Sequence, residues 1–375
     1  MSTKKTANHL KLDERNHVEK PLLDQLSGLG WEIIDLTDEK QTPAHTFRDN
    51  FTEVVMPKVL REQVKVINPW LEDDQVEEVA KQLTASFPGT GLIENNQYAL
   101  HLLLENTSVS ENRKTGEQSP TVRFIDFDKD PSKNNRFIAV CQFKVRILGT
   151  EHHIIPDIVL FVNGLPVVLI ECKSPKVKDA IPEAIDQMLR YSEQRGAKGE
   201  GSAPLFYFNQ IVIATCRQEA KFGTITTHSE KHFYRWSDPY PRTLNDLDHG
   251  SGSPNDQQRL VAGMMDKGNL LDLIRTLTLF SINDKGQTIK IVGRYQQFRA
   301  VKLAVQRLLQ GKSPRERSGI IWHTQGSGKS LTMMFMVREM YRHAALSNWK
   351  VVFVTDRTQL EGQLNETSRS IGFTV

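Results

Sequence analysis

HHIIPDIVLFVNGLPVVLIECKSP, residues 152–175, is the stretch that decides the fold of the first part of the chain. Its two apolar runs, Ile158–Val162 and Pro166–Cys172, flank Asn163-Gly164, a dipeptide typical of a tight hairpin turn. Because nearly every position in both runs is apolar, we expect two antiparallel strands that are buried on both faces. Such a hairpin belongs in the middle of a domain.

Three charged residues, Asp157, Glu171 and Lys173, stand where this hairpin opens. Side chains alternate faces along a strand, so Glu171 and Lys173 share one face. Asp157 falls opposite Glu171, with Cβ atoms about 4.5–5.5 Å apart, if the turn has three residues or if a bulge shifts the register. With a plain two-residue turn, Asp157 would face away. We predict the three-residue turn or a bulge.

Two carboxylates this close suit one Mg²⁺ ion, with the backbone carbonyl of Cys172 as a further ligand. A bound Mg²⁺ stabilises the charge that builds up on a phosphodiester, and Lys173 could orient the attacking water or help to deprotonate it. In a purely structural interpretation, Lys173 forms an ion pair with Asp157 or Glu171 and closes the edge of the sheet. The residues alone leave both interpretations open.

Helices and further strands are predicted around this hairpin. Apolar residues at helical spacing from Val18 to Leu26 predict an opening helix, and a second helical region covers Phe51–Gln82. Another helix begins near Asp179 and carries Gln187 and Tyr191 on one face; as residues alone, this pair is ordinary helix surface. The remaining predicted strands are Trp31–Leu36, Thr121–Phe127, Arg136–Ile147 and Gln210–Thr215. These elements predict a mixed α/β domain.

The length of 375 residues allows two or three domains, and the composition, 38% hydrophobic and 25% charged, is typical of globular proteins. The net charge of +3 argues neither for nor against binding to DNA. No secretory signal and no run of 18 apolar residues occurs, so we expect a cytoplasmic protein without membrane association. Cys141, Cys172 and Cys216 stand singly and are predicted to be reduced packing residues.

A domain boundary is predicted near SDPYPRTLNDLDHGSGSPNDQQ, residues 237–258, which is rich in Pro, Gly, Asp and Ser. We predict a first domain over residues 1–236 and a linker with a connecting helix, near Leu270–Phe280, over residues 237–285. The second domain, residues 286–375, begins with a helix over Gln297–Leu309.

The stretch GIIWHTQGSGKSLT, residues 319–332, predicts a phosphate-binding loop between the strand Ser318–His323 and a helix, Ser330–Ala345. A further strand over Lys350–Thr355 would complete a βαβ unit. Backbone N–H groups of such a loop cradle phosphates, Lys329 would reach the β and γ phosphates of ATP, and Ser330 would bind their Mg²⁺. His323 stands where the usual pattern has Gly. The predicted nucleotide-binding residues of the loop are Thr324, Gly326, Ser327, Gly328, Lys329 and Ser330.

The hairpin with its Pro-Asp and Glu-Cys-Lys residues resembles the PD-(D/E)xK nuclease superfamily. Together with the QxxxY helix it resembles the nuclease core of the restriction (R) subunits of type I restriction-modification enzymes. The resemblance implies a PD-(D/E)xK nuclease sheet in which Gln187 and Tyr191 support the active site and Glu19, from the first helix, approaches the metal. His152 and His153 are predicted to be structural.

The segment WHTQGSGKS resembles the first motif of superfamily 2 helicases and translocases, which implies a RecA-like domain. In RYQQFRAVKLAV, residues 294–305, Gln297 rather than Gln296 is the residue that the resemblance assigns to adenine. In VVFVTDRTQL, residues 351–360, Asp356 and Arg357 resemble the next motor motif. No later motor motif occurs before residue 375, so we expect an N-terminal fragment with an incomplete ATPase.

The resemblance implies an ATP-dependent DNA endonuclease and translocase that acts on double-stranded DNA with methyltransferase and specificity subunits. Two other interpretations are open: a stand-alone nuclease-helicase of DNA defence or repair, and an assembly module whose nuclease site is inert. Basic residues near the site are candidates for tracking the phosphates of DNA: Lys173, Lys176, Lys178, Arg190 and Arg195.

Overall fold

The computed structural model describes residues 9–11, 13–37, 40–85, 87, 89, 91–104, 107–128, 130–197, 199–247 and 252–354. Contacts divide the chain into two compact units, Met1–Leu271 and Asp272–Val375. The predicted first domain, residues 1–236, falls inside the first unit, and the predicted second domain, residues 286–375, falls inside the second. The exact domain boundaries remain predictions. No described helix combines the length and the hydrophobicity needed to cross a bilayer.

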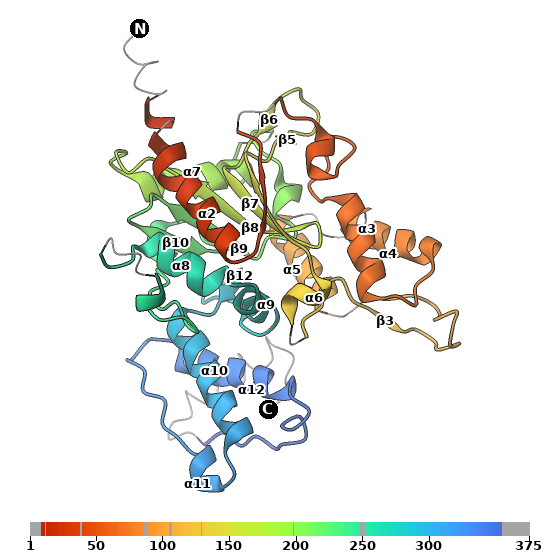
Figure 1. Ribbon diagram of the computed structural model, residues 1–375, viewed down its shortest axis with the longest axis vertical. Helices are drawn as coiled ribbons and strands as arrows, with labels where there is room; N and C mark the ends of the chain where they lie inside the picture. The colour runs from red at the N-terminus through yellow and green to blue at the C-terminus, as the bar shows by residue number, and fades with distance from the viewer. Residues whose placement is uncertain are drawn as a thin grey trace. The chain divides into compact units, whose positions relative to one another are not determined.

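A six-stranded sheet forms the centre of the first unit (Figure 1). Its order is β1 (Glu32–Asp35), β4 (Phe137–Cys141), β7 (Ile158–Val162), β8 (Leu165–Cys172), β9 (Ile211–Thr215) and β10 (Ala220–Gly223). The pairs β1–β4 and β8–β9 are parallel and the other three pairs are antiparallel. Every residue of β7 and β8 is buried. The predictions of a mixed α/β fold and of a central, doubly buried hairpin are confirmed.

The turn of this hairpin has two residues, because Val162 pairs with Leu165. Asn163 and Gly164 have φ angles of 53° and 83°, the left-handed values that tight hairpin turns require. A Cβ atom on Gly164 would lie 2.7 Å from the carbonyl oxygen of Met56, so this position also needs glycine for close approach. The three-residue turn is therefore wrong.

The predicted alternative, a bulge, is present one step further along the hairpin. Leu160 pairs with Val168, whereas Phe161 pairs with Pro166, so the register shifts by one residue on β8. After the shift Ile158 lies opposite Ile170, and the next position places Asp157 opposite Glu171. The bulge thus restores the alignment that the charged residues require.

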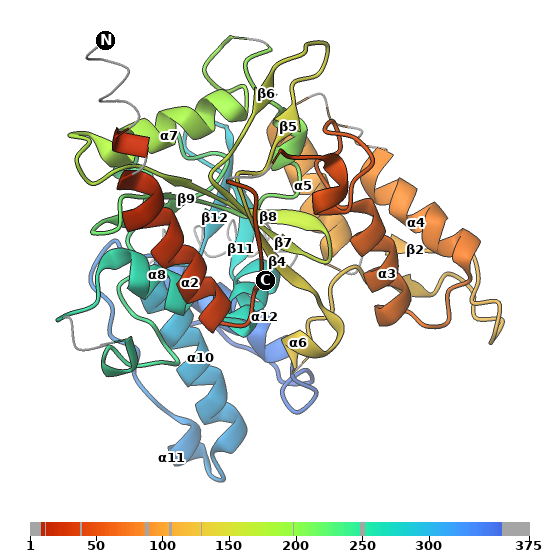
Figure 2. The same ribbon diagram turned by 45° about the horizontal axis from the view of Figure 1, so that its top comes forward.

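Helix α7 (Ala180–Tyr191) covers the sheet face on which Val159, Leu169 and Val212 lie. Helices α2 (Lys20–Gly28) and α8 (Asp256–Met264) pack against each other and against the edges of the sheet (Figure 2). Three more helices, α3 (Pro57–Ile67), α4 (Asp73–Ala85) and α5 (Leu92–Leu103), precede the central strands. The short elements are η1 (Arg15–Glu19), η2 (Pro43–Thr46), β2 (Thr107–Ser108), β3 (Thr121–Val122), α6 (Pro131–Asn134), β5 (Val145–Arg146), β6 (His153–Ile154), η3 (Ala203–Phe206), η4 (Glu230–His232) and η5 (Asn245–Leu247).

Two predicted strands of the first unit are shorter than expected, one where a side chain takes the place of a strand neighbour and one where the backbone turns out of the strand conformation. The run Thr121–Phe127 is a strand only at its first two residues; beyond them the amide of Asn163 donates to the carbonyl of Phe124 at 2.8 Å. The run Arg136–Ile147 breaks at Gln142, whose φ is 60° and whose N–H donates to the carbonyl of Asp157 at 2.7 Å. Neither interruption is visible in the apolar pattern.

In the second unit, helix α9 (Lys267–Arg275) crosses the division and ends earlier than predicted. Thr278–Ile282 forms strand β11, which pairs with β12 (Thr288–Val292) instead of continuing the helix. Helices α10 (Tyr295–Gln310), α11 (Pro314–Arg317) and α12 (Lys329–Tyr341) follow. Contacts between α10 and α12 involve a small apolar cluster of Val305, Met340 and Leu346. The two predicted long helices are confirmed within a few residues.

The predicted strands Ser318–His323 and Lys350–Thr355 are wrong where the chain is described, since residues 318–323 and 350–354 have no strand structure. Ile320 is 93% exposed and Val354 is 92% exposed. A strand is stable only when a neighbour takes its N–H and C=O groups, and neither run has such a partner among the described residues. The predicted βαβ unit is therefore reduced to its helix.

Candidate functional site

The carboxylates of Asp157 and Glu171 and the ammonium of Lys173 lie together at the open end of the β7–β8 hairpin. Asp157 Oδ2 accepts a hydrogen bond from the backbone N–H of Cys172 at 2.8 Å. Lys173 Nζ lies 3.0 Å from Glu171 Oε1 and 2.8 Å from the carbonyl oxygen of Cys172. By alternation from Val159, Asp157 faces the same side of the sheet as helix α7. The structure thus brings the predicted triad together.

Burial destabilises the charged forms of these three side chains. Glu171 is fully buried, Asp157 is 7% exposed, and the Lys173 side chain is 12% exposed. Burial raises the pKa of Glu171 well above its usual range, and repulsion from Asp157 raises it further. Burial also raises the pKa of Asp157, against the attraction of Lys173. Glu171 Oε2 is buried and receives no N–H donor, and the Glu171 and Asp157 carboxyls are in contact, an arrangement that a shared proton or a bound cation could satisfy.

Glu19, the glutamate predicted from the first helix, approaches the triad from η1. It is 3% exposed, and its pKa is raised by burial and by the charge of Asp157. Gln142 Nε2 lies 3.3 Å from Asp157 Oδ1 and 3.5 Å from Glu19 Oε1, so one amide connects the two carboxylates. Cys141 donates to Glu19 Oε2 at 3.4 Å and so contacts the site as well as the core. The role assigned to Glu19 stays a prediction, although its position agrees with it.

The sequence interpretation missed two residues of this site, Glu14 and Gln142. Single ligand oxygens of Glu14, Glu19 and Asp157 lie within 4.8 Å of one another, an arrangement that could hold a metal ion. Gln142 stood inside a predicted strand, and its positive φ leaves no trace in the sequence. Glu14 belongs to the charged stretch DERNHVEK, in which no spacing singles it out.

Gln187 and Tyr191 face each other one turn apart on α7. Gln187 Nε2 donates to Tyr191 Oη at 2.6 Å, and Tyr191 Oη donates to the carbonyl of Ile155 at 3.3 Å. Burial raises the pKa of Tyr191, and the charge of the nearby Glu171 raises this pKa further. The phenol therefore stays protonated. This pair therefore connects α7 with the chain that enters β7, which agrees with its predicted supporting role.

The structure also shows the surroundings of the predicted histidine, cysteine and basic residues. His153 is in edge-to-face contact with Phe51, with ring centroids 5.7 Å apart, as expected for a structural histidine. Cys141 and Cys172 are buried and Cys216 is half-buried, and all three are free thiols. Among the proposed phosphate-tracking residues, Lys176 pairs with Asp13 at 2.8 Å, Arg195 pairs with Asp186 at 2.8 Å, and Lys178 is exposed.

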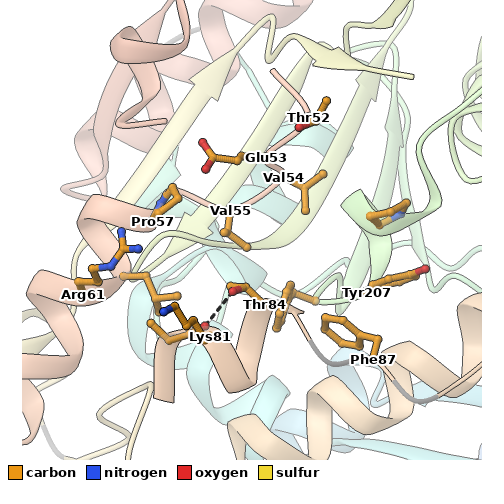
Figure 3. A pocket seen from close by; sticks show the side chains of 14 residues that line it. Thr52, Glu53, Val54, Val55, Pro57, Arg61, Lys81, Thr84, Phe87 and Tyr207 are labelled. Atoms are coloured by element: carbon orange, nitrogen blue, oxygen red, sulfur yellow. Dashed lines mark hydrogen bonds between the residues drawn. The ribbon is translucent and has the colours of Figure 1, made fainter. Parts of the chain in front are cut away.

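A cavity of about 510 Å³ lies elsewhere in the first unit, between the chain before α3, helix α4 and residues 204–208 (Figure 3). Phe87, Tyr207 and Phe208 give it an aromatic wall, and Arg61 and Lys81 stand at its rim. Arg61 is already paired with Glu77. Leu60, which also lines this cavity, contacts the Gly164 turn, so the cavity lies at the closed end of the hairpin, away from the triad.

In the second unit, residues 324–328 form a turn that leads into α12 at Lys329. Gly326 and Gly328 have φ angles of 75° and 82°, conformations that side chains rarely adopt. Gln297 Nε2 donates to the carbonyl of Gly328 at 3.1 Å, and Lys329 Nζ donates to the carbonyl of His323 at 3.1 Å. Ser327 Oγ donates to the carbonyl of Thr324 at 2.7 Å, and Ser330 is half-buried at the start of the helix.

The positive φ angles of the two glycines and the helix from Lys329 are compatible with the predicted phosphate loop, whereas the strand predicted before it is absent from the described residues. The first N–H groups of α12 have no partners within the helix. They can therefore donate hydrogen bonds to a bound anion. Gln297 packs against the loop, as a residue beside a bound nucleotide would. Asp356 and Arg357, the predicted second motor motif, lie outside the described residues.

The charge of the nuclease-like site fits a divalent cation. Among the described residues, the carboxylates of Glu14, Glu19, Asp157 and Glu171 are paired with two cationic groups, Lys173 and Arg15, and Arg15 is shared with Asp35. At least two negative charges therefore remain uncompensated when all four carboxyls are ionised. Carboxylate and carbonyl oxygens in this number are the ligands that Mg²⁺ and Mn²⁺ prefer.

Comparisons with known proteins identify relatives of both parts of the chain. Residues 11–231 match the family described as type I restriction enzyme R protein N terminus, and residues 296–375 match the SWI2/SNF2 ATPase family. The endonuclease subunit of the type I restriction enzyme HindI of Haemophilus influenzae is 33% identical over 95% of this chain and 32% of its own length. The SauMSSORF170P endonuclease subunit of Staphylococcus aureus is 24% identical over 93% of this chain and 32% of its own length. The chain thus spans about a third of the curated relatives that it matches.

Proposed function

The chain belongs to the family of type I restriction enzyme R proteins, and we propose that its first unit is a Mg²⁺-dependent DNA endonuclease domain with a PD-(D/E)xK fold. The observation that carries this proposal is the convergence of Asp157, Glu171 and Lys173 at the open end of a buried hairpin, where Glu171 Oε2 receives no N–H donor. A structural ion pair alone would leave that buried oxygen without such a donor.

Asp157, Glu171 and the carbonyl of Cys172 would hold the cation. When bound, Mg²⁺ supplies Lewis-acid stabilisation of the phosphodiester and lowers the pKa of a bound water. The chain fixes the geometry of these ligands: the N–H of Cys172 orients Asp157, and Gln142 connects Asp157 with Glu19.

Lys173 acts as a charged donor in this proposal. Burial would lower its pKa, but the attraction of Glu171 and Asp157 outweighs burial and raises the pKa above its usual range. The ammonium form is therefore favoured at neutral pH, which suits orientation of the attacking water or of a phosphate oxygen better than deprotonation of water. Gln187 and Tyr191 position the chain entering β7 and keep Asp157 in place.

For the second unit we propose ATP binding by the start of a RecA-like translocase domain. The loop of residues 324–328 would cradle the phosphates, Lys329 would reach the β and γ phosphates, and Ser330 would bind their Mg²⁺. Gln297 would contact the adenine. The proposed partners are double-stranded DNA and the methyltransferase and specificity subunits of a type I complex, in which ATP-driven movement precedes cleavage.

Replacing Asp157 by asparagine tests the nuclease proposal. We expect Mg²⁺-dependent nicking of supercoiled plasmid to fall by at least about 100-fold, because one metal-holding charge is lost where charge develops in the transition state. The assay should compare Asp157→Asn with Asp24→Asn, a matched change of an exposed residue on α2. Both should be measured in the chain and in the full-length subunit assembled with its partners and ATP.

Equal cutting by Asp157→Asn and the parent would show that the hairpin charges are structural. If the parent itself does not cut in the assembly, the chain belongs to an inert assembly module. Cutting that needs no methyltransferase or specificity subunit would instead indicate a stand-alone nuclease-helicase.

Replacing Lys329 by alanine tests nucleotide binding by the second unit. We expect the variant to lose at least about tenfold in affinity for ATP, since charge-assisted contacts to phosphate contribute about 1.5–3 kcal/mol. Fluorescence titration with a labelled ATP analogue measures the change, with Lys312→Ala, an exposed lysine after α10, as control. Unchanged affinity in Lys329→Ala, with normal melting, would remove the phosphate-loop assignment.

A further inference from the structure

Glu14 lies five residues before Glu19, yet both carboxylates reach the same place. Single ligand oxygens of Glu14, Glu19 and Asp157 are within 4.8 Å of one another, and Glu14 is half-buried. Two oxygens on opposite sides of a Mg²⁺ ion lie about 4.2 Å apart, so a small closure would bring all three into a coordination shell.

A local change of helix type explains why these two glutamates converge. Residues Arg15–Glu19 form a π-helix, in which the N–H of Lys20 donates to the carbonyl of Arg15, five residues back. In a regular α-helix, residues five apart point about 140° away from each other. The wider π turn brings Glu14 and Glu19 towards one side, a use typical of π-bulges at functional sites.

The segment that carries Glu14 is anchored to the loop after β8. Glu14 Oε2 accepts the backbone N–H of Ser174 at 3.1 Å. Asp13 accepts the hydroxyl of Ser174 at 2.5 Å and pairs with Lys176 at 2.8 Å. The residue that follows Lys173 is therefore held by the same two acidic residues. The remaining lone pairs of the Glu14 carboxylate stay available for a ligand.

An independent feature indicates a cation at this place. Glu171 Oε2 is buried and receives no N–H donor, and the Glu171 carboxyl is in hydrogen-bond contact with that of Asp157, a member of the three-carboxylate group. Two buried carboxyls in contact are poorly accommodated as a pair of anions without a positive ion.

We propose that Glu14 is a further metal ligand of the nuclease site and that binding of the cation holds the segment Asp13–Glu19 against the loop that carries Lys173. This inference rests on the proposed nuclease function and deepens it, because it adds a carboxylate that no sequence motif indicates. The metal site is then built from two parts, the hairpin and the N-terminal π-helix.

The test is a calorimetric titration of the whole chain with Mn²⁺ alone, repeated with Mg²⁺, in the parent and in Glu14→Gln. The glutamine oxygen can still accept the Ser174 N–H, so the substitution removes the charge and keeps the anchor. We expect Mn²⁺ affinity to fall by about tenfold or more, because even residues that only support metal ligands change affinity by about 10–100-fold. The metal-induced rise in melting temperature should shrink in parallel.

Glu183→Gln, an exposed glutamate on α7, is the matched control and should bind Mn²⁺ like the parent. Glu14→Asp, which keeps the charge on a shorter side chain, should be intermediate and covers the case that Glu14→Gln fails to fold. If Glu14→Gln binds Mn²⁺ within twofold of the parent while Asp157→Asn does not bind, Glu14 is no ligand and the nuclease proposal stands. If Asp157→Asn also binds like the parent, the nuclease proposal itself fails.

Discussion

The substitution Lys173→Ala should reduce Mg²⁺-dependent cleavage by about 100- to 1000-fold, the usual effect of removing a charged donor aimed at a transition state. Lys173 Nζ lies 3.0 Å from Glu171 Oε1, and its side chain is only 12% exposed, so no other described cation can take its place at this oxygen. Single-turnover nicking of supercoiled plasmid measures the effect.

Metal binding separates a catalytic from a structural role of this lysine. Because Lys173 donates to ligands and is not one itself, Mn²⁺ affinity in Lys173→Ala should stay within a few-fold of the parent or rise. Lys173→Arg keeps the charge but not the compact ammonium, so it should fold like the parent and recover little cleavage. Lys133→Ala, an exposed lysine on α6, should cut normally. If Lys173→Ala cuts as fast as the parent, Lys173 has no catalytic role and only forms a structural ion pair.

The second large effect is expected on stability: Glu171→Gln should melt at a higher temperature than the parent in the presence of EDTA. The carboxylate is fully buried beside Asp157, and burial together with this repulsion raises its pKa well above the usual range. One unit of such a shift corresponds to about 1.4 kcal/mol of unfavourable free energy for the charged form. A neutral amide of the same shape avoids this penalty, so we expect a gain of at least about 1 kcal/mol near neutral pH.

The pH dependence of this gain follows from the direction of the pKa shift. A carboxyl whose pKa is raised by folding does not destabilise the fold below its unfolded pKa of about 4.3, and it destabilises the fold increasingly as pH rises towards the folded pKa. The difference in melting temperature between Glu171→Gln and the parent should therefore be small near the unfolded pKa and grow with pH.

Mg²⁺ should reverse the order of the two proteins. The cation stabilises the parent by RT ln(1 + [Mg²⁺]/Kd), which increases with its concentration, and has little effect on Glu171→Gln, which lacks a ligand charge. Differential scanning calorimetry with EDTA and with Mg²⁺ measures both effects, with Glu183→Gln as control. A parent that melts above Glu171→Gln in EDTA at every pH would show that the Lys173–Glu171 pair stabilises the fold, contrary to a site built for a metal.

The central hairpin, the mixed α/β class, the QxxxY helix and the helix after the proposed phosphate loop could all be predicted from the sequence. These elements depend on interactions close in the chain: apolar runs of fixed period, the Asn163-Gly164 turn and glycines before Lys329. Local patterns of this kind are sufficient when backbone hydrogen bonds and burial agree with them.

The residues that complete the site could not be predicted from the sequence, because contacts between distant segments place them. Sequence reasoning left two ways of aligning Asp157 with Glu171, and the structure has the bulge, together with a two-residue turn at which Gly164 packs against Met56, a residue distant in the sequence. Gln142 contacts Asp157 because a positive φ interrupts the apolar run at this residue. Glu14 lies near Asp157 because the chain forms a π turn between Glu14 and Glu19. The strands predicted at residues 318–323 and 350–354 did not form because a strand depends on a neighbour that no local pattern supplies. Features that rest on contacts between distant segments leave no period in the sequence, and those contacts assemble the carboxylates of this site.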